Sequence, residues 1–170
     1  CCTIISAATP LQSRQKEILM FNGSPLRVPN LCTPSPDLIT CGMPGPEDLR
    51  QARQAGIKTI INLCQPQEPS PEEPRLPAEL GMGYHNIPVG GAADLTETKA
   101  RQLAAIVNDC NNHPVLIHCM SGNRVGALLA MKTFYADGKS AQESLQAGRA
   151  AGLKGLEPEV VRILSSQPAR

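Results

Sequence analysis

The segment Val115-Leu-Ile-His-Cys-Met-Ser-Gly-Asn-Arg124 carries the strongest structural signal in this chain. Its first three residues are apolar and predict a short buried strand that ends at His118. A loop with one glycine follows, and the residues from Arg124 to about Ala136 are apolar on most sides, which predicts a helix in the core. A strand, a tight loop and a helix in this order are typical of α/β sheets, in which ligands bind beyond the carboxyl ends of the strands.

The alternation of strands and helices continues on both sides of this segment. Apolar runs predict three further strands, at Leu38–Cys41, Lys58–Leu63 and Tyr84–Val89. Helical spacing and helix-start signals predict helices at 46–56 and 96–110, and others that begin near Ser140 and Pro158. This order predicts an α/β domain with three layers, αβα, around a small, mostly parallel central sheet.

Two regions lack such a pattern. Residues 1–30 are predicted to form a loosely packed lead-in before a single domain at 31–170. The first eight residues end in small side chains and resemble the remnant of an export signal, so both a cytoplasmic and an exported, periplasmic location are compatible with the sequence. Residues 65–77 contain five prolines, which exclude a helix or a central strand and predict an excursion over the surface.

The composition argues against several classes of function. The chain has 170 residues and a formal net charge of +1, and no cluster of Lys and Arg is dense enough for nucleic acid. No apolar run reaches the length of a membrane span. The seven cysteines are odd in number and lack the spacings of a disulfide framework or a zinc site, so neither a metal nor another cofactor is predicted. Nothing in the sequence indicates an oligomeric state.

The loop between the strand and the helix has the chemistry of an anion-binding site. Backbone N–H groups and the positive end of the helix converge there, and Gly122 allows the tight turn. A cysteine at this point, Cys119, is expected to ionise readily, and Arg124 is expected to bind an oxyanion through two parallel hydrogen bonds. The loop residues Met120, Ser121 and Asn123 would line the site, with the proline-rich segment on its rim. The alternative is a buried cysteine at a strand end, followed by an arginine by chance.

The segment His118-Cys-Met-Ser-Gly-Asn-Arg124 resembles the signature loop of the cysteine-dependent protein tyrosine and dual-specificity phosphatases. The chain is more closely similar to the small bacterial phosphatase-like family related to them, over roughly residues 37–165. Other segments that carry the similarity are Ile39-Thr-Cys-Gly-Met-Pro44, Gly56-Ile-Lys-Thr-Ile-Ile-Asn-Leu63, His85-Asn-Ile-Pro-Val89 and Gly148-Arg-Ala-Ala-Gly-Leu153. The resemblance implies that Cys119 attacks a phosphorylated substrate, or another small oxyanion, and forms a thiophosphate intermediate. Arg124 and the loop amides would then hold the phosphoryl group.

Three features depart from the wider superfamily. Four residues separate Cys119 from Arg124 instead of the usual five, which implies a smaller or differently oriented anion. Val125 stands where Ser or Thr often assists departure of the thiolate, which implies slow breakdown of the intermediate. The general acid is normally an aspartate on the loop after Ile-Pro-Val89, and Asp94 is the candidate for it here. Asp94 is also well placed to cap the helix that follows.

Two more residues receive roles from the resemblance. Cys64 ends a strand in Asn-Leu-Cys, as in some cysteine phosphatases whose thiol at this position traps the oxidised nucleophile in a reversible disulfide. The alternative for Cys64 is a buried cysteine without a redox role. His118 is expected to orient the loop by hydrogen bonding rather than to transfer protons.

Two other functions are compatible with the loop. Four residues between cysteine and arginine is also the length common in rhodanese-like sulfurtransferases, whose thiolate carries a persulfide, although the upstream segments typical of those domains are missing. A phosphate-binding pseudophosphatase without turnover would also fit Val125 and the displaced acid.

Overall fold

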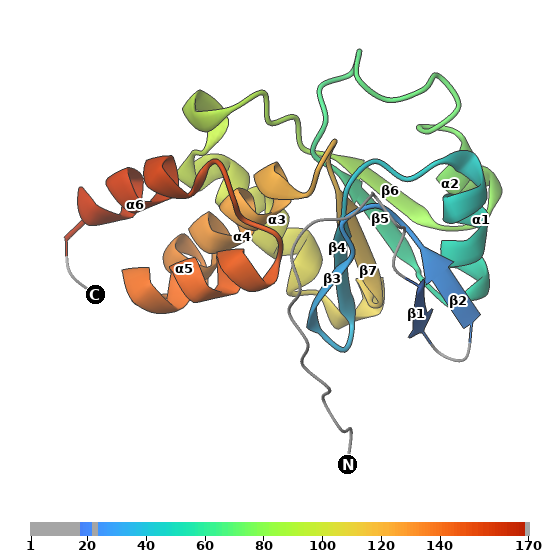
Figure 1. Cartoon of the computed structure of the whole chain (residues 1–170), viewed down its shortest axis with the longest axis horizontal. Coiled ribbons are helices and arrows are strands. Elements are labelled where there is room, and N and C mark those ends of the chain that lie inside the picture. Colours follow the sequence, from blue (N-terminus) through green and yellow to red (C-terminus); the bar gives the residue numbers. More distant parts are fainter. Residues whose placement is uncertain (1–17, 22–23, 169–170) are drawn as a thin grey trace, which may run out of the picture.

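A five-stranded sheet lies at the centre of the computed structural model, which describes residues 18–21 and 24–168 (Figure 1). The strand order is β3-β4-β7-β5-β6, and all neighbours are parallel except β3, which runs antiparallel to β4. The strands are β3 (Cys32–Ser35), β4 (Leu38–Cys41), β5 (Thr59–Asn62), β6 (Gly83–Asn86) and β7 (Val115–His118). A separate hairpin consists of β1 (Ile18–Phe21) and β2 (Ser24–Arg27).

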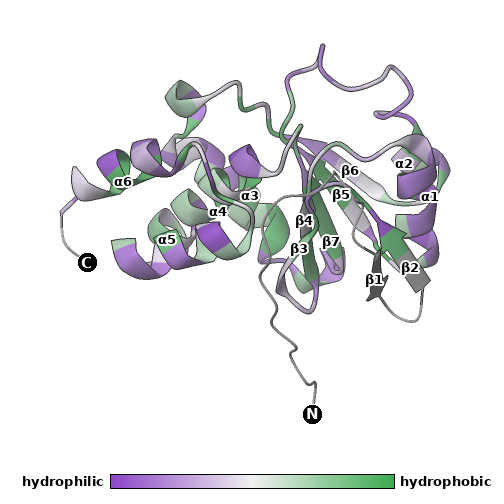
Figure 2. Cartoon of the chain, viewed as in Figure 1, coloured by the Kyte–Doolittle hydropathy of each residue, from purple (hydrophilic) through white to green (hydrophobic). Residues whose placement is uncertain are grey.

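Helices cover both faces of the sheet and form two apolar cores. Helices α1 (Pro46–Gln54) and α2 (Leu76–Glu79) cover one face; α3 (Glu97–Val107), α4 (Asn123–Tyr135), α5 (Ala141–Ala150) and α6 (Glu157–Ser165) lie on the other (Figure 1). The three-layer α/β fold with a mostly parallel sheet is therefore confirmed. Figure 2 shows hydrophobic residues along the central strands and hydrophilic ones on the outer helices.

The helix starts follow from local sequence. Ser140 accepts a hydrogen bond from the Glu143 N–H, and the Glu143 carboxylate accepts one from the Ser140 N–H, so the predicted capping box opens α5. Pro46 occupies the first turn of α1. The cap of α3 is Thr96, whose hydroxyl accepts from the Lys99 N–H at 3.3 Å. The expectation that Asp94 caps this helix is therefore wrong.

The N-terminal part of the described chain is more ordered than its sequence suggests. Leu26 and Val28 are fully buried in the core beneath α1, so the expectation of a loosely packed lead-in to residue 30 is wrong for these residues. Burial of their side chains against α1, which no local periodicity signals, is the physical reason. The possible signal remnant at the N-terminus lies outside the described residues.

Helix α4 packs unusually close to the segment that ends α5. A Cβ atom at Gly126 would lie 2.2 Å from the backbone nitrogen of Leu153 and 2.7 Å from the carbonyl oxygen of Gly148. Only glycine permits this approach. The first turns of α4, which begin directly after the loop at Cys119, therefore pack against the backbone that follows α5.

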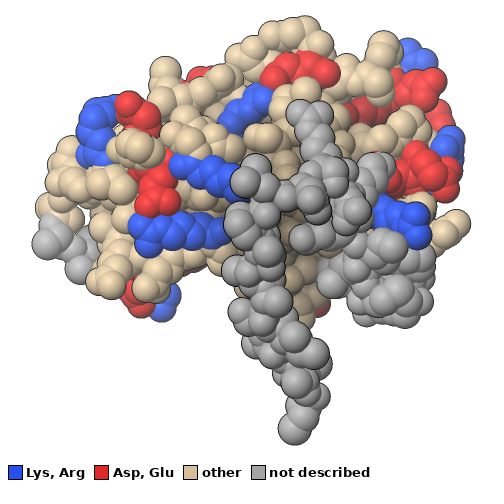
Figure 3. Space-filling view, in the orientation of Figure 1, with Lys and Arg blue, Asp and Glu red and all other residues tan. Residues whose placement is uncertain are grey.

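Basic and acidic side chains lie next to one another on the visible surface. On the face shown in Figure 3, basic and acidic side chains are interspersed. Within residues 18–21 and 24–168, no helix combines the length and the apolar character that crossing a membrane requires.

Candidate active site

The sheet register brings three strand ends to one place. In β7, His118 pairs with Cys41 of β4 on one side and with Asn62 of β5 on the other. Cys119 therefore leaves the sheet at its central strand, with β4 and β5 ending beside it. This is the carboxyl edge at which α/β sheets bind ligands.

The loop holds the sulfur of Cys119 against a backbone donor. The Gly122 N–H donates to Cys119 Sγ at 3.1 Å, and the Cys119 side chain is fully buried. Gly122 has φ of 89°, a conformation that favours glycine, and α4 begins at the next residue. The predicted turn, donor and helix start thus meet at one sulfur atom.

Contacts from the β4 side hold the outer part of the loop. The Asn30 side-chain amide donates to the Ser121 carbonyl at 3.0 Å, and the Met43 N–H donates to the Met120 carbonyl at 3.1 Å. Gly42 fits closely under the loop, because a Cβ there would lie 2.9 Å from the Met120 carbonyl oxygen. With these carbonyls engaged from outside, the loop conformation that directs Gly122 N–H toward the sulfur is fixed.

The side chains of Met120 and Asn123 have different surroundings. Met120 is 48% exposed, as expected for a residue on the rim. Asn123 instead turns toward the segment before α6, where its side-chain oxygen accepts hydrogen bonds from the N–H groups of Lys154 and Leu156. Asn123 is therefore a brace between α4 and that segment.

Arg124 is held by a carboxylate from the proline-rich segment. Its two terminal nitrogens each donate to one oxygen of Glu68 at 2.8 Å, and one of them also donates to the Val89 carbonyl at 2.8 Å. These hydrogen bonds lower the pKa of Glu68 to about 2 and raise the pKa of Arg124 above its usual value. A two-oxygen anion thus already occupies the arginine fork in the manner expected of a phosphate.

A second acidic side chain from the same segment reaches His118, the residue before Cys119. Glu73 Oε1 lies 2.8 Å from His118 Nε2, and both side chains are buried. Neither ring nitrogen of His118 makes a hydrogen bond within residues 18–21 and 24–168, so the expectation that His118 orients the loop by hydrogen bonding is wrong. Because a buried carboxylate is costly without a partner, this contact fixes both the segment and His118.

Asp94 lies on the loop that follows the Val89 contact. It is the last residue of η1 (Ala92–Asp94), and its carboxylate accepts from the Gly90 N–H at 2.7 Å and pairs with Lys99 at 3.1 Å. The Gly90 hydrogen bond, then Lys99, hold the pKa of Asp94 below its usual value. Asp94 is thus ionised in this conformation. Its loop follows Val89, whose carbonyl accepts a hydrogen bond from Arg124.

Cys64 lies at the end of the strand next to β7. Its N–H donates to the Asn62 side-chain oxygen at 2.7 Å, and its carbonyl accepts from the Asn86 side chain at 3.0 Å. The side chain is buried, and this burial raises the pKa of the Cys64 thiol to about 12. Cys64 is therefore a protonated thiol at neutral pH.

The sequence did not indicate Asn30, Glu68 or Glu73 as site residues. Two acidic residues in a segment expected on the rim were the available signal for Glu68 and Glu73. Asn30 has a positive φ of 50°, and no local pattern announces its contact. Within residues 18–21 and 24–168, no group of three or more His, Cys, Asp or Glu side chains is arranged to hold a metal ion.

The fold and the loop together define the class of cysteine-dependent phosphatases. Residues 40–136, more than half of the chain, match the model of a family described as "Polymorphic toxin system, DSP-PTPase phosphatase". The chain therefore belongs to this family, which is related to the protein tyrosine and dual-specificity phosphatases. The family match covers Glu68, Asp94, Cys119 and Arg124.

One curated relative and several solved structures are similar to this chain. The inositol diphosphatase DSP2 of Oryza sativa subsp. japonica is 31% identical over 94 residues, which are 52% of this chain and 45% of the rice protein. The chain thus spans less than half the length of that relative. Among solved structures, a candidate phosphatase from Neisseria meningitidis has a TM-score of 0.65 at 24% identity, over 80% of this chain and 97% of that one. The catalytic domain of the PP-IP phosphatase Siw14 from S. cerevisiae has a TM-score of 0.61 at 19% identity, over 79% and 85%.

Proposed function

We propose that this protein hydrolyses phosphoric monoesters through a cysteinyl-phosphate intermediate. The Cys119 thiolate attacks phosphorus, the ester oxygen leaves with a proton from Asp94, and water then cleaves the sulfur–phosphorus bond to release inorganic phosphate. The observation that carries the proposal is the hydrogen bond from Gly122 N–H to Cys119 Sγ at the start of α4. The same loop presents Arg124 for the phosphoryl oxygens.

The proposal is tested with purified protein and two assays. Release of p-nitrophenol and phosphate from p-nitrophenyl phosphate is expected. Thiocyanate formation from thiosulfate and cyanide, the reaction of the rhodanese-like alternative, is not expected. Thiocyanate formation without phosphate release would contradict the proposal, as would tight phosphate binding without any turnover. The family match supports the phosphatase reaction over the rhodanese-like alternative.

Asp94→Asn tests the proposed general acid. We expect kcat to fall about 10²–10⁴-fold for alkyl phosphates, whose leaving oxygen needs a proton, and much less for p-nitrophenyl phosphate, whose leaving group is stable as an anion. Because contacts with Gly90 and Lys99 keep Asp94 ionised in this conformation, the acid form requires that this loop rearrange around the bound substrate. Rates measured over a series of leaving groups check the expectation.

The control is Asp137→Asn, which breaks a similar aspartate–lysine pair, with Lys132 at 2.8 Å, away from the loop. Equal losses for good and poor leaving groups in Asp94→Asn would rule out proton donation by this residue.

We also propose that Cys64 protects the nucleophile from overoxidation. Peroxide converts the Cys119 thiolate to a sulfenic acid, and the Cys64 sulfur displaces water from it to form a disulfide. Because burial raises the Cys64 pKa to about 12, we expect this second step to accelerate as pH rises from 7 to 9. Peptide mass mapping after mild oxidation should find the 64–119 pair, and Cys64→Ser should accumulate the sulfenic acid. Mapping that never finds this pair in the wild type would end the idea.

A further inference from the structure

The loop around the sulfur carries very little positive charge. The four residues between Cys119 and Arg124 are Met, Ser, Gly and Asn, none of them charged. Arg124 is thus the single cation of the loop itself, and Glu68 already engages both of its terminal nitrogens. Lys99, on the first turn of α3, is held by Asp94 and by the Pro88 carbonyl.

Negative charge, in contrast, is built into the site from the proline-rich segment. Glu68 lies on Arg124 with its side chain 27% exposed, so its charge is felt by a ligand in the adjoining solvent. Its low pKa of about 2 keeps it ionised at any physiological pH. One phosphate can bind the loop amides and share the Arg124 guanidinium with Glu68. A further phosphate on the same molecule would face the Glu68 carboxylate and be repelled by it.

One exposed apolar side chain lies on the loop, next to Cys119. Met120 directly follows the nucleophile and is one of the two large hydrophobic side chains that are exposed among the described residues. A flexible thioether in this place offers contact to an aromatic or other apolar leaving group and no partner for an anion.

We infer that the site selects singly phosphorylated esters with an apolar leaving group and rejects substrates with several phosphates, and that Glu68 is the residue that enforces the rejection. This inference rests on the proposed phosphatase function and adds the substrate class to it. It distinguishes the chain from its rice relative, whose name specifies an inositol diphosphatase.

The test uses two phosphotyrosine peptides that share one leaving group and differ in a single added phosphate. One peptide has alanine and the other phosphoserine next to the phosphotyrosine. We expect the wild type to prefer the first by about tenfold in kcat/KM, the size of a like-charge repulsion in a partly exposed site. Glu68→Gln should reduce the preference to less than about threefold, and Glu68→Asp, which retains the charge, should restore it.

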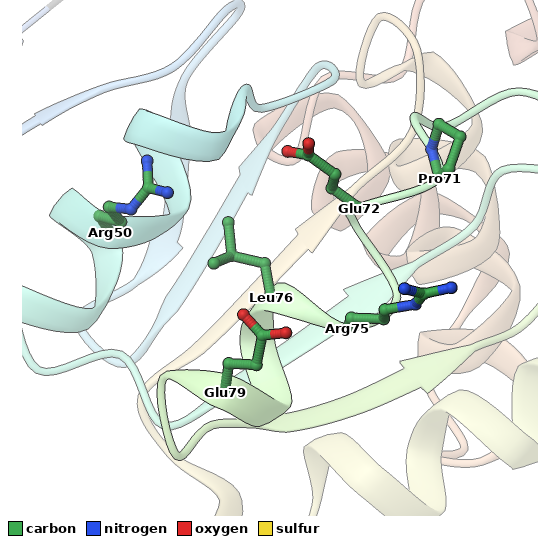
Figure 4. A pocket seen from close by; sticks show the side chains of 6 residues that line it. All are labelled: Arg50, Pro71, Glu72, Arg75, Leu76 and Glu79. Atoms are coloured by element: carbon green, nitrogen blue, oxygen red, sulfur yellow. The ribbon is translucent and has the colours of Figure 1, made fainter.

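Glu72→Gln is the matched control. Glu72 is an exposed residue of the same segment and lines a separate cavity of about 370 Å³ beside α1 and α2, together with Arg50 and Leu76 (Figure 4). The Glu72→Gln substitution removes the same charge four residues from Glu68, and we expect this variant to keep the tenfold preference for the singly phosphorylated peptide. A preference that survives in Glu68→Gln, or that is absent from the wild type, overturns the inference.

Binding measurements separate this inference from the phosphatase reaction itself. Calorimetry with the Cys119→Ser variant gives the affinity for each peptide and for inositol hexakisphosphate without turnover. We expect the singly phosphorylated peptide to bind tightest to Cys119→Ser. Adding Glu68→Gln should raise the affinity for inositol hexakisphosphate more than the affinity for either peptide. If wild-type protein hydrolyses neither peptide but these affinities hold, the proposed reaction fails and charge selection stands. If inositol hexakisphosphate is the tightest ligand of the single variant Cys119→Ser, which retains Glu68, the inference that Glu68 rejects substrates with several phosphates fails.

Discussion

Cys119→Ser is expected to abolish phosphate release, with kcat lower by about 10⁴–10⁶-fold, as for other enzymes that lose a covalent nucleophile. The hydroxyl of serine is a much weaker nucleophile than the thiolate proposed for Cys119, and the Gly122 N–H would face its oxygen in place of the sulfur. The side chain is fully buried and the two residues are nearly the same size, so the fold and the anion site should persist. Stopped-flow and steady-state assays with p-nitrophenyl phosphate measure the loss.

The control for this prediction is Cys110→Ser. Cys110 is a free, exposed cysteine in η2 (Cys110–Asn112), away from the loop, so the same atomic change there should leave kcat within about twofold, as for most surface substitutions. Isothermal titration with inorganic phosphate should still detect binding by Cys119→Ser. Residual turnover above about 1% of wild type, on the scale set by such nucleophile losses, would assign the chemistry to another residue.

Arg124→Lys is expected to lower kcat/KM by about 10²–10³-fold, although the positive charge remains. Lysine has no planar fork, so it cannot bind two phosphoryl oxygens in parallel or preserve the paired contacts with Glu68. Arg124→Ala should lose more, because it would also leave the Glu68 carboxylate unpaired near the incoming phosphate. Steady-state kinetics with p-nitrophenyl phosphate give the ratio.

Arg149→Lys is the matched control for this second prediction. Arg149 also meets one glutamate, Glu157, through two nitrogens, but the pair is exposed and links the end of α5 to α6. We expect kcat/KM within about twofold of wild type, because exposed ion pairs contribute little. Comparable losses at Arg124 and Arg149 would mean that Arg124 acts through stability and not through the phosphoryl group.

The parallel part of the sheet could be predicted because each of its central strands is a short apolar run, and a helix pattern follows two of them, β4 and β7. The strand β3 could not, since Cys32-Thr-Pro-Ser35 contains proline and polar residues and becomes a strand only by pairing with β4. The burial of Leu26 and Val28 could not be predicted either, because it too depends on a contact with another element. Their burial is decided by α1, which is distant in sequence.

The candidate site divides in the same way. Cys119, Gly122 and Arg124 lie within six residues, so their geometry is local and their arrangement could be expected from the sequence. Glu68 and Glu73 could not be placed, because a run of prolines indicates only that regular structure is absent. Where such a segment turns is decided by what it meets, and here it meets Arg124 and His118, which are about fifty residues away.

The close packing of Gly126 against the backbone of Leu153 limits which substitutions this domain can accept during evolution. A single added methyl group would push the first turns of α4 away and tilt the guanidinium that projects from them. Residues that never meet a ligand therefore share the mutational intolerance of those that do. Drift in this lineage should spare the contact between these two backbones, while the exposed surfaces of the same helices vary freely.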